Sequence, residues 1–286
     1  MEQEKTAVKA SPDKYINTGR ATLLAVIKLM EALAGLYLIY YVITVPDAVK
    51  SLVQNFYEGL SLQGGADSAF GSTYTSLLDM IRIILVFELL LIVLDGFASF
   101  FTRTAHKRAG LVKVCHRVRF VFSVIGFVFL FVVLFQYIRT VIETSQKMKQ
   151  MGLGDVFSFL GSYQLILYLI VIVGAYWILV DYDMYVARVM KQVSREVRAG
   201  EILPMKKKNR LGRESAWLCG ILTASVVLSV VALVGGDGIL ASVAYYAAPV
   251  QLLYRGSNAV SIAAAAVLAF KFFLVNRCSA DFDHAH

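Results

Sequence analysis

Residues 77–101 read LLDMIRIILVFELLLIVLDGFASFF, and residues 102–119 continue as TRTAHKRAGLVKVCHRVR. The first stretch is almost entirely apolar, whereas the second contains six Lys and Arg residues. About 20 apolar residues in a helix are enough to span the roughly 30 Å hydrocarbon core of a bilayer. Because lipid offers the backbone no hydrogen-bond partner, such a run has to be helical. Together these two stretches therefore predict a transmembrane helix followed by a basic link.

The composition extends this prediction to the whole chain. Of the 286 residues, 58% are hydrophobic and 17% are charged, whereas a soluble domain has about 25% charged residues. The apolar runs also lack the alternation of polar and apolar side chains that marks the roughly 10-residue strands of a membrane β-barrel. We therefore expect an all-α integral membrane protein.

Six apolar runs are long enough to cross a membrane, at about 21–45, 77–101, 118–142, 157–181, 214–235 and 257–276. They predict a bundle of six transmembrane helices between a polar segment, 1–20, and a tail, 277–286. We expect the tail to be disordered, because chain termini are usually untethered. Similar short motifs before the spans are compatible with three repeated hairpins. Six evenly spaced spans would give the same periods without any repeat.

The basic residues alternate from link to link and so predict the topology. The N-terminal segment and the second and fourth links are rich in Lys and Arg, whereas the other three links hold only Lys50, Lys147, Lys149 and Arg255. Basic links stay in the cytoplasm. We therefore place the chain in the cell membrane with both termini in the cytoplasm.

The net charge of +8 suits anionic lipid headgroups at the membrane surface better than nucleic acid. The densest basic run lies in the fourth link, where it is a candidate headgroup site and, more simply, a topology signal. Its members are Lys206, Lys207, Lys208 and Arg210.

In three further segments, the pattern of apolar and polar residues predicts the local structure. The run that begins at 157 is expected to continue as a helix into the cytoplasm, because Val186, Val189 and Val193 keep helical spacing until Gly200 and Pro204 interrupt it. Residues 46–60 form an amphipathic pattern, typical of a helix in the outer membrane interface or of a short lid. Residues 239–254 are apolar but too short to cross, which indicates an interfacial or re-entrant segment.

Ionisable side chains inside a span are costly and therefore point to function. With a rise of about 1.5 Å per residue, Glu88 falls near the midplane and Glu31 slightly to its cytoplasmic side. Lys28, Asp95 and Lys271 fall at similar depths nearer the cytoplasm. Antiparallel neighbours would then place Lys28 against Asp95 and Lys271 near Glu31. These five residues are the candidate intramembrane polar site.

Two interpretations of this polar site stay open. A carboxylate in excess at the midplane suits proton or cation handling, because desolvation disfavours its charged form. Alternatively, Lys28 and Lys271 extend toward the inner face and hold their charges in the headgroup region, while Glu31 pairs with Lys28 and does nothing more.

The last two spans carry small side chains at about four-residue spacing. Small residues allow membrane helices to approach closely, which predicts a place in the protein interior or at the interface with a second copy or another membrane protein. The residues are Gly220, Ala224, Ser225, Ser229, Ser261, Ala265 and Ala269.

The sequence contains no HExxH, GxSxG, Walker or complete GxGxxG motif, so we expect neither an enzyme nor a bound metal or cofactor. The leading functional hypothesis is a small transporter or channel-like permease. It would be coupled to cations or protons through Glu31, Glu88 and Asp95. The alternative is a non-catalytic membrane subunit or regulator of a larger assembly, which would use the small-residue faces and the basic links.

Overall fold

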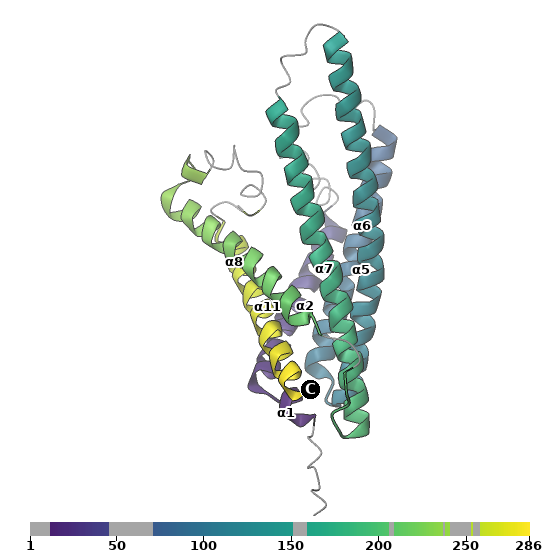
Figure 1. Ribbon diagram of the computed structural model, residues 1–286, viewed down its shortest axis with the longest axis vertical. Helices are drawn as coiled ribbons and strands as arrows, with labels where there is room; N and C mark the ends of the chain where they lie inside the picture. The colour runs from purple at the N-terminus through teal and green to yellow at the C-terminus, as the bar shows by residue number, and fades with distance from the viewer. Residues whose placement is uncertain are drawn as a thin grey trace, which may run out of the picture. The chain divides into compact units, whose positions relative to one another are not determined.

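The computed structural model describes residues 12–45, 71–150, 159–205, 209–236, 238–240, 253 and 258–286, and it is helical with no strand among them. The helices run in chain order (Figure 1) as α1 (Asp13–Ile16), α2 (Gly19–Thr44), α5 (Gly71–Phe101), α6 (Ala105–Gln150), α7 (Phe159–Ala199), α8 (Leu211–Gly235) and α11 (Ala259–Ala285). The predicted all-α class is confirmed. Each of the six predicted spans overlaps one of the six long helices.

Four helical stretches in the described part of the chain are long and apolar enough to cross a membrane: α2, Arg82–Phe101 of α5, α8 and α11. They support a membrane-spanning helical protein. Spans within α6 and α7, the cytoplasmic position of the termini and the hairpin arrangement remain predictions. The amphipathic segment 46–60 and most of 239–254 lie outside the described residues.

The chain divides into two compact units. The first unit comprises Met1–Arg119, Tyr182–Ser215 and Phe273–His286, and the second comprises Phe120–Asp181 and Ala216–Phe272. Each is described below by itself. Of the five residues of the candidate intramembrane polar site, Lys28, Glu31, Glu88 and Asp95 belong to the first unit, and Lys271 belongs to the second.

Within the first unit, α2 packs closely against α5. A Cβ atom on Gly96 would lie 2.3 Å from the carbonyl oxygen of Lys28 and 2.6 Å from the Cβ of Ala32. At the other end of this contact, the guanidinium of Arg82 donates hydrogen bonds to the carbonyl oxygens of Val42 at 3.0 Å and Ile43 at 2.7 Å. Arg82 thereby satisfies carbonyls that the last turn of a helix leaves without partners.

The contact at Gly96 gives a first prediction. Gly96→Ala should lower the free energy of unfolding by about 1–3 kcal/mol, because the added methyl meets backbone atoms that cannot rotate away. SDS titration of the purified protein in mixed micelles would measure the change. Gly110→Ala in α6, where nothing lies within 4 Å of the new Cβ, is the matched control and should be neutral or slightly stabilising. Equal stabilities of the two variants would contradict the close contact.

Two expectations about helix ends have different outcomes. The continuation of α7 is confirmed, since the helix ends at Ala199 and Gly200 adopts a φ of 70°. The prediction that the tail is disordered is wrong, because α11 continues to Ala285. The tail is ordered because the Tyr15 ring packs edge-on against Phe282 at 5.3 Å, and this contact places α1 beside the end of α11 (Figure 1).

The second unit contains the small residues of the last two spans. Ser225, Ser229, Ala265 and Ala269 are buried within this single chain, and the hydroxyl of Ser225 donates to the carbonyl oxygen of Leu253 at 2.7 Å. Ala224 and Ser261 are half-buried, whereas Gly220 is exposed. More than half of the predicted small face is therefore buried within the second unit, and its interface with a second copy or another membrane protein stays a prediction.

Candidate functional site

A buried ion pair between α2 and α5 forms the start of the site. The ammonium of Lys28 lies 2.8 Å from an oxygen of Asp95, and both side chains are buried. The structure thus brings together the two residues that equal depth on antiparallel neighbours predicted as a pair. Burial makes each charge dependent on the other, because an unpaired ion is costly away from water.

His116 of α6 links this pair to α7. Its Nδ1 lies 2.7 Å from Oδ1 of Asp183, and its Nε2 lies 3.5 Å from Oδ2 of Asp95. Only 1% of His116 is exposed, and the ring of Tyr182 packs edge-on against it with centroids 6.1 Å apart. One imidazole therefore stands between carboxylates from two different helices.

Arg119 extends the arrangement to Glu88. Its guanidinium lies 3.4 Å from Asp183 and 3.4 Å from Glu88. His116 and Arg119 are three residues apart and therefore share one face of α6. Together the six residues form a continuous array, which we call the charge network: Lys28, Asp95, His116, Asp183, Arg119 and Glu88.

The charge network is short of positive charge unless it holds a proton. It has three carboxylates, whereas only two of its side chains, those of Lys28 and Arg119, are cationic when the imidazole is neutral. Oδ1 of Asp95 and Nε2 of His116 are buried and make no hydrogen bond within the described residues. Buried polar atoms without a hydrogen-bond partner are rare in native structures and are often found at functional sites.

The remaining predicted residues take other places. Glu31 is half-buried on α2 and close enough for its charge to act on Tyr182. Lys271 belongs to the second unit, where its ammonium lies over the ring of Phe272 at 5.4 Å. The proximity of Lys271 to Glu31 stays a prediction. Arg210 is exposed, and Lys206, Lys207 and Lys208 lie outside the described residues.

Sequence reasoning missed His116, Arg119 and Asp183. The first two stand in the segment 102–119, which was interpreted as a basic link, and Asp183 follows the end of the predicted span 157–181. The sequence did contain a signal, because His116 stands four residues after Val112 and Val112 three after Ala109, which is helical spacing with two apolar residues. In the structure all three residues are buried. Helical spacing that continues into a basic link places those link residues on the buried face.

A second buried carboxylate in the first unit joins distant parts of the chain. Glu196 of α7 is 0% exposed and accepts hydrogen bonds from the hydroxyl of Tyr15, from Nε2 of His286 at 2.7 Å and from Nε2 of Gln192 at 2.7 Å. Burial, and then the hydrogen bond to Glu196, raise the pKa of Tyr15 above its ordinary value. The phenol therefore remains a donor at neutral pH. These four residues are the terminal cluster.

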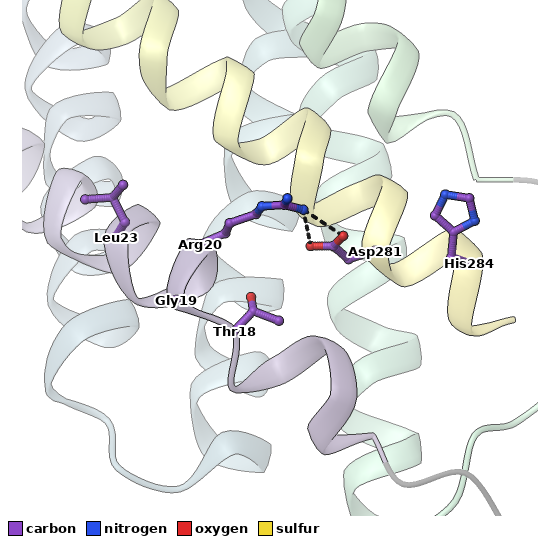
Figure 2. A pocket seen from close by; sticks show the side chains of 6 residues that line it. All are labelled: Thr18, Gly19, Arg20, Leu23, Asp281 and His284. Atoms are coloured by element: carbon purple, nitrogen blue, oxygen red, sulfur yellow. Dashed lines mark hydrogen bonds and ion pairs between the residues drawn. The ribbon is translucent and has the colours of Figure 1, made fainter.

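An open groove beside α1 completes the polar features of this unit. Figure 2 shows Arg20 at the start of α2 and Asp281 near the end of α11 pointing toward each other. The guanidinium meets the two carboxylate oxygens at 2.9 and 3.1 Å. Arg20 is largely exposed, so this pair contributes far less than a buried one.

Comparisons of the chain with protein families, with curated proteins and with solved structures find no match.

Proposed function

We propose that this chain is a membrane transporter for a small solute or ion and that its transport is coupled to a proton carried by His116. The single observation that supports the proposal is the position of the buried His116 between Asp95 of α5 and Asp183 of α7. Ionisable groups inside membrane proteins mark ion pathways and proton relays by default.

The protonation state of His116 would decide which helices are tied together. A protonated imidazole has two N–H donors and can hold Asp95 and Asp183 at once, whereas a neutral imidazole has one donor. Loss of the proton therefore frees one carboxylate from the imidazole and leaves Arg119 as the remaining charge-network contact between α6 and that helix. This is a change between two discrete states, which alternating access requires.

The proton also sets the net charge of the interior. With His116 protonated, the three cations of the charge network balance its three carboxylates. Without that proton the network holds one negative charge in excess, which favours uptake of another cation or of a new proton. In this proposal Glu88, which lies on the far side of Arg119, senses that excess charge. The predicted cell-membrane location with both termini in the cytoplasm is part of this proposal.

Proton flux in proteoliposomes tests the proposal. Vesicles loaded with a pH-sensitive dye would report proton movement under a potassium diffusion potential, with and without mixtures of small amines, carboxylates, amino acids and sugars outside. Removal of a proton-transfer group typically costs about 10²–10⁴-fold in rate. We therefore expect His116→Gln to reduce flux at least tenfold, and Glu88→Gln to reduce it as well.

His106→Gln is the matched control. His106 also lies on α6, but its partners are Ser194 and Arg198, and it is not part of the charge network. Its flux should equal that of the wild type. Wild-type vesicles no faster than protein-free vesicles in every solute mixture would contradict transport and leave the non-catalytic subunit as the better function.

A further inference from the structure

A mostly apolar cavity of about 170 Å³ lies within the first unit, separate from the groove of Figure 2. Its wall comes from α1, α2, α5, α6, α7, α8 and α11 and is formed mainly by aliphatic and aromatic side chains, including Leu24, Val112, Val189, Val193 and Phe282. Ligand pockets are typically lined by hydrophobic and aromatic side chains with a small number of polar groups that orient the ligand. The wall therefore suits a hydrocarbon guest.

Two cationic side chains line this cavity, and only one of them has an ion-pair partner in the described part of the chain. Lys28 is neutralised by Asp95 at 2.8 Å. Arg108 of α6 is half-buried, and within the described part of the chain its side chain has neither an ion pair nor a hydrogen bond. A guanidinium beside an apolar wall offers a site for an anion, because it can bind a carboxylate with two parallel hydrogen bonds.

We propose that this cavity binds a single-chain aliphatic carboxylate, with the chain against the apolar wall and the carboxylate on Arg108. The volume admits one short chain and excludes a two-chain lipid. The charge of Arg108 selects an anionic head over a neutral or cationic one. The cavity shares Lys28 with the charge network, but the counter-ion of Lys28 is Asp95, so the carboxylate of the ligand is assigned to Arg108 and need not touch His116.

Photocrosslinking tests the proposal on the full chain in nanodiscs. The probe is octanoate that carries a diazirine at the chain end, and labelled peptides are mapped by mass spectrometry. We expect saturable labelling of the cavity-lining segments of α6, α7 and α11. Unlabelled octanoate should compete, octanol should compete at least tenfold less well, and octyltrimethylammonium should not compete, when each is compared at equal mole fraction in the bilayer.

Paired variants separate the cavity from general exposure to lipid. Arg108→Gln should weaken labelling at least tenfold, whereas Lys107→Gln, at the exposed neighbouring position, should not. Val189→Trp should fill the cavity and abolish labelling, whereas Leu111→Trp, at a position of α6 that is 50% exposed, should leave it intact. Should Val189→Trp fail to fold, Ala25→Leu fills the same space from α2.

Several results would overturn the proposal. These are labelling that does not saturate, labelling that survives both filling variants, equal effects of Arg108→Gln and Lys107→Gln, and equal competition by octanol and octanoate. None of them depends on proton flux, so this site and the proposed transport fail separately.

Discussion

Asp95→Asn is expected to lower the free energy of unfolding by about 3–5 kcal/mol, because it leaves the ammonium of Lys28 buried without a counter-charge. The pair is 2.8 Å apart, and the exposed fractions of Lys28 and Asp95 are 7% and 5%, so water cannot replace the lost carboxylate. SDS titration in mixed micelles measures the change. His116 would lose its second carboxylate in the same variant.

A double variant distinguishes the loss of the counter-charge from a change in side-chain packing at position 95. Lys28→Met in the Asp95→Asn background removes the stranded ammonium and should recover more than half of the lost stability. Asp281→Asn is the matched control, since it breaks an Asp–Arg pair in which Arg20 is 53% exposed. Solvent screening should keep its cost below about 1 kcal/mol. Equal losses for Asp95→Asn and Asp281→Asn would contradict the buried pair.

Glu196→Ala is expected to release both ends of the described chain. The carboxylate is fully buried and accepts from Tyr15, Gln192 and His286. Its removal strands these donors, and stranded donors cost about 1–3 kcal/mol each, without simple additivity. A net loss of about 3 kcal/mol corresponds to a roughly hundredfold rise in local opening. Hydrogen exchange followed by mass spectrometry should show this rise in α1 and in the last turns of α11.

Tyr15→Phe provides the graded control for the terminal cluster. It removes one donor and keeps the ring that packs on Phe282, so its cost should be about 1 kcal/mol. Exchange in the α2–α5 contact should not change in either variant. Faster exchange throughout the first unit would show that Glu196 supports general stability, and unchanged exchange in α1 would refute its role as the anchor.

The helices were predictable because each depends on a local pattern. Long apolar runs predicted α2, α5, α8 and α11, and the spacing of Val186, Val189 and Val193 predicted the extension of α7 to Ala199. The pairing of Lys28 with Asp95 followed from one further step, the equal depth of two residues on neighbouring helices. Each of these inferences needs only residues that are close in sequence or a single distance along a helix axis.

The centre of the candidate site was not predictable in the same way. His116 and Arg119 stand in a segment whose many cations gave a topology signal, and that signal hid their burial. The order of 277–285 likewise depends on partners that are far away in sequence, namely Tyr15 and Glu196. Contacts of this kind follow from which helix faces meet, and composition does not specify them.

By itself the sequence determined that this chain is helical and apolar enough for a membrane, because backbone hydrogen bonding in lipid and side-chain hydrophobicity act within each segment. Only the tertiary structure decided which ionisable groups meet. The energy of a buried charge depends on partners within a few ångströms, and Asp95, His116 and Asp183 come within that range only when α5, α6 and α7 pack together.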